Sequence, residues 1–216
     1  MIETRQIADG TVDFTMMYVA HDAFIRDLRR LATACERGDA WSTRTQAGWA
    51  MFAEQLHLHH STEDSALWPR LRAEPLEPDA VLIVDAMERE HAQLEPQLEH
   101  VEKAFADHDA TLLLIGLQVL GVGLAAHTLH EESDTLPLVD RYLGADGWDR
   151  FGQEIRESQG GLKAGAAYLP WVLDGATPDM ERKVLAQLPP PARVLYRRVW
   201  APKYRRSNWW NGAVGT

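Results

Sequence analysis

The sequence predicts an all-α protein, an antiparallel up-down four-helix bundle followed by a mostly helical or irregular C-terminal extension. Apolar residues recur at three- and four-residue spacing through the first two thirds of the chain, whereas the alternation typical of strands is weak. Two stretches, His59–Asp64 and His127–Glu132, repeat one pattern in which a Glu follows a His by four residues. A lone His precedes each stretch, at His21 and His91. Four side chains of one kind, one on each helix, are typical of a site built inside a bundle.

The first two helices are bounded by residues that start or end helices. We expect the first helix to run from Thr11, a candidate N-cap, to Gly38, a candidate C-terminal glycine. The second begins after Ser42 and runs to about Arg72, where a segment rich in Glu and Pro breaks the pattern.

The third helix is expected from Pro78 to about Asp107, because proline is tolerated in the first turn, where its missing N–H does no harm. Pro96 lies inside this helix and is expected to kink it just after His91. The fourth helix runs from about Asp109 to Leu143 and ends at Gly144.

The spacing of the four histidines tests this layout. In an up-down bundle, residues at one level lie equally far from the turn that joins their helices. The midpoints between successive histidines fall at residues 40, 75 and 109, and all three coincide with turn signals. The sequence therefore predicts that the four histidines meet at one level.

The residues after the bundle differ in character. We divide the chain into a bundle, residues 1–145, and an extension, residues 146–216, that packs on it. Helices are expected near Trp148–Glu157 and Met180–Leu188, with a turn at Gly160-Gly161. Five of the eight Trp residues lie in the extension, and so many aromatic residues argue against disorder.

Charge and cysteine content argue against several classes of protein. The net charge of −10 disfavours a general nucleic-acid binder. The segment from Gln187 onward nevertheless carries six Lys or Arg and no acid, which leaves −16 on the rest. Cys35 is the only cysteine, so neither an intrachain disulfide nor a cysteine-based metal site is expected. The N-terminus lacks the apolar core of a signal peptide, and no membrane span is expected, so the expected location is the cytoplasm.

The repeated motif predicts a metal site. A His and a Glu four residues apart share one helix face, and imidazole nitrogen with carboxylate oxygen is the ligand mix of non-haem iron or zinc. Glu63 and Glu131 are the natural bridges between two ions, and open coordination positions remain for O2, peroxide or NO. The predicted metal ligands are His21, His59, Glu63, His91, His127 and Glu131.

Neighbouring residues are weaker candidates. Glu95 lies one turn past His91 and is a possible seventh ligand, although Pro96 follows it. His60 is turned about 100° from His59, which favours a supporting or surface role over ligation. Asp64 and Glu132 are expected to be solvated or to hydrogen-bond a ligand histidine. Tyr18 and Gly123 lie a turn before His21 and His127. Tyr18 is a candidate hydrogen-bond donor to a bound oxygen species, and Gly123, which has no side chain, would leave space for that species.

The arrangement resembles the hemerythrin-like (HHE cation-binding) domain, on the motifs His21–Arg26, His59–Pro69, Glu90-His91 and His127–Glu132. The resemblance covers about residues 11–143. It implies two iron ions joined by an oxo or hydroxo bridge, with zinc or another divalent ion as the alternative occupant. The extension resembles the tail of some actinobacterial members. Respiratory hemerythrins carry a second His on the third helix, where Glu95 stands here, and an acid five rather than four residues after the fourth-helix His. These departures argue against simple O2 carriage.

Three functions remain open at this stage. The first is a non-haem di-iron protein that binds, senses or detoxifies O2, peroxide or NO. The second is an iron store or donor for the repair of iron centres. The third is a structural or interaction bundle that uses its basic, aromatic tail. Neither an enzymatic activity nor an oligomeric state follows from the sequence.

A ferritin-like di-iron bundle is the nearest rival architecture. Such bundles use Glu-x-x-His on two helices and a Glu on each of the other two. The strings Glu54–His57 and Glu88–His91 match the motif but fall on the second and third helices, and the first helix lacks a Glu at the matching level.

Overall fold

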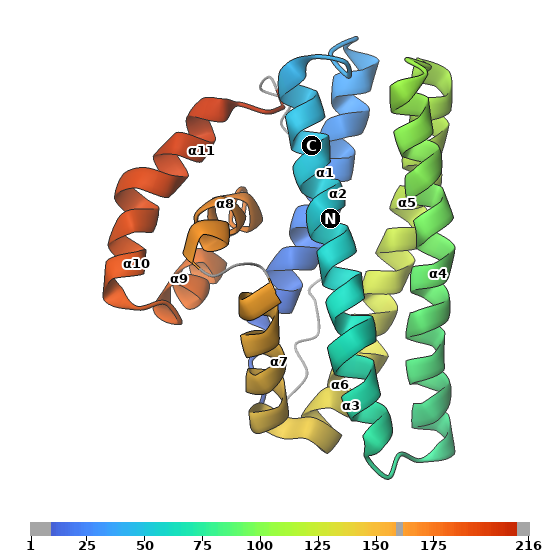
Figure 1. Ribbon diagram of the computed structural model, residues 1–216, viewed down its shortest axis with the longest axis vertical. Helices are drawn as coiled ribbons and strands as arrows, with labels where there is room; N and C mark the ends of the chain where they lie inside the picture. The colour runs from blue at the N-terminus through green and yellow to red at the C-terminus, as the bar shows by residue number, and fades with distance from the viewer. Residues whose placement is uncertain (1–9, 159–161, 211–216) are drawn as a thin grey trace.

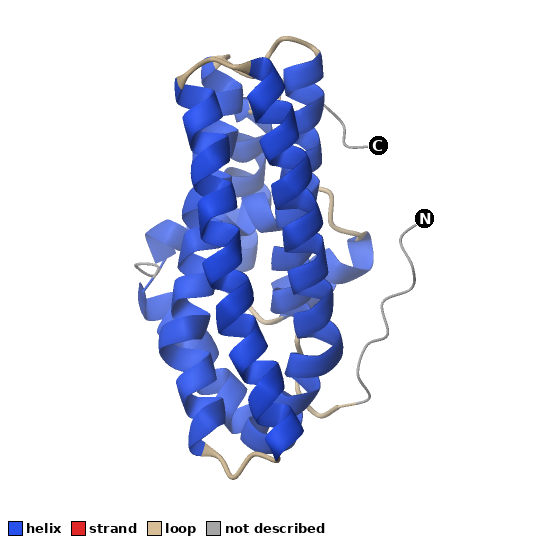
Figure 2. Ribbon diagram, turned by 90° about the vertical axis from the view of Figure 1, so that its right-hand side faces the viewer, coloured by secondary structure: helices blue, strands red, loops and turns tan. Residues whose placement is uncertain are grey.

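A computed structural model describes residues 10–158 and 162–210, and within these ranges every regular element is helical (Figures 1 and 2). The all-α prediction is therefore confirmed. Four long helical segments form the bundle. In chain order they are α1 (Thr15–Glu36); α2 (Thr43–Thr62) continued by η1 (Glu63–Leu67) and α3 (Trp68–Ala73); α4 (Pro78–Ala106); and α5 (Ala110–His130) continued by η2 (Glu131–Thr135), α6 (Leu136–Leu138) and η3 (Val139–Leu143).

The turns between the long helices lie where the sequence places them. Gly38 follows α1 with a φ of +78°, the left-handed conformation that glycine adopts without steric cost. The Ser42 hydroxyl accepts a hydrogen bond from the Thr45 N–H and caps α2. The Asp109 carboxylate accepts from the Leu112 N–H and caps α5 in the same way. Pro78 is the first residue of α4, as expected.

The predicted N-cap of the first helix is wrong. The helix begins at Thr15, and Thr11 instead donates its backbone N–H and its hydroxyl to Asp140, at 2.8 and 3.1 Å. Asp13 accepts the N–H of Thr15 at 2.9 Å. Thr11 therefore contacts the end of the fourth segment and does not cap the first helix.

The second and fourth segments each contain a π-helical turn that begins at a glutamate of the repeated motif. The Trp68 N–H donates to the Glu63 carbonyl, and the Leu136 N–H donates to the Glu131 carbonyl, five residues back in each case. A proline follows each turn, at Pro69 and Pro137, and it cannot supply the hydrogen bond of an ordinary α-helix. Such turns are frequent at functional sites. In contrast, α4 runs without interruption through Pro96, and the expected kink there stays a prediction.

The bundle interior is divided into two apolar clusters. The larger includes Phe24, Leu56, Leu94 and Leu124. The smaller includes Met17, Tyr18, Trp68 and Met87, with residues of the fourth segment. The four named members of the larger cluster lie three residues from His21, His59, His91 and His127, on the same side of each histidine. A layer of histidines therefore separates the two clusters.

The extension is mostly helical and lies along α1 (Figure 1). Its helices are α7 (Gly144–Ser158), α8 (Leu162–Val172), α9 (Pro178–Ala186), α10 (Pro190–Leu195), η4 (Tyr196–Trp200) and α11 (Ala201–Ser207). The expected helices near 148–157 and 180–188 correspond to α7 and α9. The expected turn at Gly160-Gly161 lies outside the described residues.

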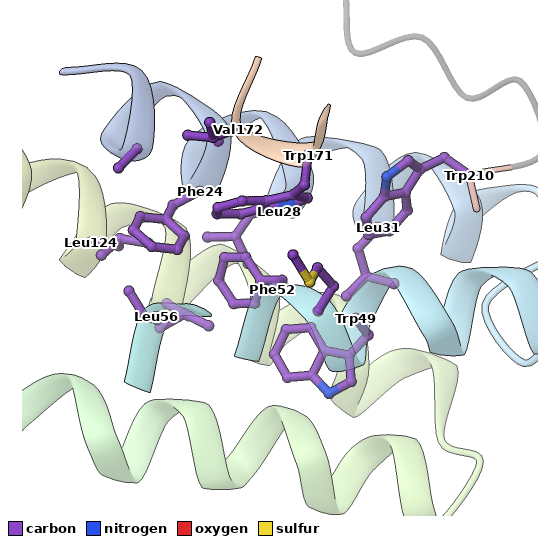
Figure 3. Close-up of a cluster of buried hydrophobic side chains, with 14 of the residues drawn as sticks. Phe24, Leu28, Leu31, Trp49, Phe52, Leu56, Leu124, Trp171, Val172 and Trp210 are labelled. Atoms are coloured by element: carbon purple, nitrogen blue, oxygen red, sulfur yellow. The ribbon is translucent and has the colours of Figure 1, made fainter. Parts of the chain in front are cut away.

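Two tryptophans anchor the extension on the bundle (Figure 3). Trp171 is fully buried, with its ring centroid 5.5 Å from that of Phe24. Trp210 packs on α2 at Gly48, where an added Cβ would lie 2.7 Å from the indole ring. The absence of a side chain at Gly48 therefore makes room for Trp210.

A buried acid adds a polar contact to this interface. The Asp27 carboxylate on α1 accepts from the Trp171 indole N–H at 2.7 Å and pairs with Arg26 at 2.7 Å. Arg30 lies 3.5 Å from Asp27 and 2.6 Å from Asp174 in the extension. The Oδ2 atom of Asp27 thus receives its hydrogen bond from the extension, whereas Oδ1 pairs with arginines of α1.

The basic residues of the tail point away from this interface. Arg197, Arg198, Lys203, Arg205 and Arg206 are all exposed, and none of them forms an ion pair with another described residue. Tyr196 and Ala201, on the other face of the same segment, are buried. Apolar packing, rather than charge pairing, therefore holds this segment on the body.

One helical stretch, Ala110–Ile155, is long and apolar enough by length and composition to cross a membrane, with 33% of its most apolar window buried. A core helix of a bundle passes the same test, and this one carries His127 and Glu131 on its buried face. The stretch therefore gives only weak support to a membrane span.

Replacing Asp27 by alanine is expected to lower the free energy of unfolding by about 3–5 kcal/mol, because Arg26, Arg30 and the Trp171 N–H lose a buried partner together. Urea unfolding followed by circular dichroism measures the change. Asp149→Ala, on an exposed face of α7, is the matched control and should change the free energy by less than about 0.5 kcal/mol. Equal stability of the two variants would contradict the role given to Asp27.

Candidate metal centre

The four predicted histidines and two glutamates meet in the layer between the two apolar clusters. His21, His91 and His127 are buried, and Glu63 and Glu131 have no exposed surface. The His59 side chain keeps 13% of its surface exposed. One histidine comes from each long segment, as the spacing of the sequence predicts, and the two glutamates stand at the starts of the two π turns.

The ligand atoms divide into two groups. The first consists of His21, His59 and Glu131, whose candidate donor atoms all lie within 4.8 Å of one another. The Nε2 atoms of His21 and His59 are 3.2 Å apart, and His21 Nε2 is 3.1 Å from Glu131 Oε2. Two donors at right angles on an ion, each about 2.1 Å from it, are about 3.0 Å apart, so this spacing fits one ion.

The second group consists of His60, His91 and His127, again with donor atoms within 4.8 Å. The Nε2 atoms of His91 and His127 are 3.1 Å apart. The His60 ring stacks on the His91 ring, with centroids 4.0 Å apart and planes 16° from parallel. His60 is thus part of the centre, whereas its sequence position favoured a supporting or surface role.

Glu63 lies between the two groups. Its Oε1 atom is 3.2 Å from His59 Nε2 in the first group, and its Oε2 atom is 3.6 Å from His91 Nε2 in the second. Glu63 therefore contacts a histidine of each group. The contact of Glu131 is with His21, which places it within the first group.

The buried carboxylates fit a metal better than they fit a metal-free core. None of the four oxygens of Glu63 and Glu131 receives a hydrogen bond of acceptable geometry, although imidazole nitrogens lie close to them. The Nε2 atom of His60 is also buried without a hydrogen bond. Buried polar atoms normally form hydrogen bonds. Four carboxylate oxygens and one imidazole nitrogen without a hydrogen bond around one small volume therefore indicate a cation site.

Carboxylates outside the layer orient three of the histidines. The Nδ1 atoms of His21, His91 and His127 lie 2.8, 2.8 and 2.9 Å from Glu132, Asp64 and Glu90. A carboxylate on one ring nitrogen fixes the other nitrogen toward the centre and makes it a better ligand. The expectation that Asp64 and Glu132 hydrogen-bond ligand histidines is thus confirmed.

Glu90 was not identified from the sequence. It lies on α4 beside His91, yet it accepts from His127 and His130 of α5, at 2.9 and 2.7 Å. In the sequence Glu90 is next to His91, and this position suggests His91 as its partner. In the structure Glu90 instead accepts from His127 and His130 of the neighbouring helix.

The ionisation of the metal-free centre follows from burial and from these pairs. Burial alone would lower the pKa of His21, but Glu131 and Glu132 outweigh it and raise that pKa to about 9. Burial would raise the pKa of Glu131, but the charge of His21 dominates and lowers it to about 2. These two residues therefore form an ion pair at neutral pH.

Burial shifts several other residues of the centre toward their neutral forms. Burial, with smaller effects of neighbouring charges, lowers the pKa of His59, His60 and His127. Burial and then the charges of Glu131 and Asp64 raise the pKa of Glu63 well above its usual value. Neutral imidazoles have the lone pair that a metal needs, so most of the histidines are ready to ligate.

Two sequence-based candidates are not in the centre. Glu95 is exposed on α4 and belongs to neither group. Gly123 faces α4 rather than the metal layer, because an added Cβ would lie 2.8 Å from Gln97 Oε1 and 3.1 Å from Leu94 Cδ2. The missing side chain at Gly123 therefore lets α5 pack closely against α4. Tyr18 is buried in the smaller apolar cluster, and its donor role stays a prediction.

The ferritin-like alternative does not match this geometry. Glu54 and His57 are exposed, and Glu88 forms a surface ion pair with Arg72 at 2.5 Å. Of these two motifs, only His91 contributes to the centre.

A small cavity of about 40 Å³ adjoins the centre at His59. Phe24 and Leu58 of the bundle line it together with Ile155 and Tyr168 of the extension. Burial raises the pKa of Tyr168, so its hydroxyl stays protonated. The cavity has room for about three waters or a small ligand, since one water needs roughly 10–15 Å³ of such volume.

Comparison with known proteins identifies the family. No curated protein and no solved structure matches the chain. The family model of the hemerythrin HHE cation-binding domain matches residues 12–139, more than half of the chain and all of the metal layer. The chain therefore belongs to the hemerythrin HHE cation-binding domain family.

Proposed function

We propose that the protein binds two iron ions and uses them to bind, sense or detoxify O2, peroxide or NO. His21, His59 and Glu131 would hold one ion, and the second group of three histidines the other. Glu63 would be shared between them. The observation that carries the proposal is the set of buried, unsatisfied carboxylate oxygens in contact with both histidine groups.

The donor set supports iron over structural zinc. Five imidazoles and two carboxylates offer nitrogen and oxygen only, and structural zinc sites are usually closed, four-coordinate and rich in cysteine. Seven protein residues spread over two ions leave coordination positions open. Iron bound in such a site supplies redox chemistry toward O2, peroxide or NO.

The residues around the layer would control what reaches it. The acids on His21, His91 and His127 hold the imidazoles in place, and the apolar layer that includes Phe24 and Leu124 limits water. The small cavity beside His59 supports a small ligand. Tyr168 on its wall provides a neutral hydrogen-bond donor from the extension.

A second function, binding of an acidic partner, is favoured by one observation. Five exposed cations of the tail have no ion-pair partner among the described residues. An electrophoretic assay with DNA or RNA at several salt concentrations tests it, because binding by such cations weakens as salt rises.

Metal analysis and a visible spectrum of aerobically purified protein test the proposed function. We expect about two irons per chain and an oxo-to-iron charge-transfer band, both lost in Glu131→Ala and reduced in His59→Ala. Peroxide turnover compared with the rate of autoxidation then separates an enzyme from a carrier or store. A single zinc, or no metal in a folded protein, would refute the proposal.

His60→Ala is expected to weaken metal binding in the second group by at least about 10–100-fold, the usual cost of losing a partner of a ligand, because one of its three histidines is lost. Titration of the metal-free protein with Fe²⁺ under anaerobic conditions should show one ion bound as in the wild type and one bound weakly. His57→Ala is the matched control, because His57 is exposed on the same helix one turn earlier. Two equally tight ions in His60→Ala would exclude His60 as a ligand.

Metal loading at pH 7.5 is expected to release at least about one proton per chain, from His21, because a pKa of about 9 keeps this residue protonated without metal and it must lose the proton to ligate. The contribution of His21 to this count should disappear as the pH rises through about 9, where His21 becomes neutral by itself. Calorimetric titration in two buffers of different ionisation enthalpy measures the count. A value near zero at pH 7.5 would contradict the assigned charges.

A further inference from the structure

Helix α5 is apolar on its outer face as well as on its inner face. Its residues Ala110–His130 include no Asp, Glu, Lys or Arg. Leu113, Leu117, Leu120 and Leu124 are buried inside the bundle. A helix that is apolar all round is normally buried on all sides. One side of α5 is not covered in the monomer, so this helix lacks a partner.

The exposed residues of α5 form one continuous stripe, which we call the α5 stripe. Its large members are among the most exposed apolar side chains of the molecule, with 73% exposure at Val122 and 67% at Leu129. Successive members are three, four, three, four and three residues apart. The α5 stripe consists of Leu112, Ile115, Val119, Val122, Ala126 and Leu129.

This spacing is a heptad repeat with both core positions apolar, the pattern by which one helix packs along another. The stripe extends along about 30 Å of helix. The neighbours Gln118, Gly121 and Ala125 are small or uncharged, and no atom lies within 4 Å of a Cβ built on Gly121. A partner helix can therefore approach the backbone of α5 closely.

The geometry points to a second copy of this chain as the partner, with the two α5 helices antiparallel. An antiparallel pair centred between Leu120 and Gly121 places Leu112 opposite Leu129, and Val119 opposite Val122. It also places Ile115 opposite Ala126, so that a large residue meets a small one in that layer. A parallel pair would instead place Ala126 opposite itself and leave a gap.

Charge favours a second copy over a lipid surface. Helices that lie on membranes carry Lys and Arg beside the apolar face. The α5 stripe instead has acids, Asp107 and Asp109, at one end and no Lys or Arg within α5, in a chain of net charge −10. Two copies of so acidic a protein associate most favourably through a face without charge, and α5 supplies one.

The area of the stripe is suited to the centre of a dimer interface. A strip of about 30 Å by 10 Å covers on the order of 300 Å² in projection, which is about the size of the largest apolar patch on a typical monomer, and such a patch is often functional. A standard interface needs roughly 800 Å² per partner, so the flanks of α1 and α4 would form the rim. The extension lies on the opposite side of the bundle and leaves this face open (Figures 1 and 2).

Sedimentation velocity of the full-length protein over a range of concentrations tests the proposal. We expect a wild-type species of twice 24.4 kDa, and an increase of about 100-fold or more in the dimer dissociation constant for Val122→Glu. Ala126→Glu, at a smaller exposed residue of the same stripe, should raise the dissociation constant in the same way. Val194→Glu is the matched control, because Val194 is 59% exposed on α10, and it should leave the dimer unchanged.

Three results would overturn the proposal. They are a wild-type protein that stays at 24.4 kDa at every concentration, dimers that persist in both stripe variants, and a monomer that floats with phosphatidylcholine–phosphatidylglycerol vesicles. Circular dichroism of each variant shows that it is folded.

The orientation has its own test in a Cys35→Ser background. Leu112→Cys and Leu129→Cys proteins should form a disulfide when mixed, whereas Leu112→Cys alone should not, because its two copies lie on the order of 26 Å apart. Cross-linking of Leu112→Cys with itself would overturn the antiparallel arrangement. None of these measurements depends on metal content, so their outcome is separate from that of the proposed function.

Discussion

Two carboxylates, Glu63 and Glu131, are completely buried in the middle of the bundle. Burying an unpaired charge costs several kcal/mol, and the centre limits this cost in two ways. Burial raises the pKa of Glu63, which favours its neutral form, and Glu131 pairs with a charged His21. Burial also lowers the pKa of His59, His60 and His127. The rest of the bundle is arranged around this layer, because the apolar residues separate into one cluster on each side of it.

The same layer would couple folding to the binding of a metal. A metal-free bundle has two apolar clusters joined across a zone where hydrogen bonds are missing, whereas a cation in that zone would give the carboxylates and His60 the partners that they lack. The acids Glu132, Asp64 and Glu90 act from outside the layer, where each keeps part of its side chain exposed. Glu90 holds a histidine of the neighbouring helix, so α4 and α5 are fixed relative to each other at the level of the centre.

The level of the centre was predictable because helix periodicity and turn residues are local signals. His21, His59, His91 and His127 meet because Gly38, Pro75 and Asp109 fix where the chain reverses. His60 was not predictable in the same way. The sequence places it 100° from His59 on an ideal helix, and only the packing of α2 against α4 brings it onto His91. The extension was predictable as helical, but its contacts were not, since nothing local marks Asp27 as the acceptor for an indole 144 residues away.

The contact between Asp27 and Trp171 bears on how the chain could be divided. The family match ends at residue 139, which suggests a unit that could be excised. Cutting there would remove the indole that covers Phe24 and the donor that satisfies Asp27, and would open the cavity beside His59 to solvent. A shortened chain would then differ from the natural one in its access to solvent as well as in its stability. In this protein the segment after the bundle is part of the wall around the centre.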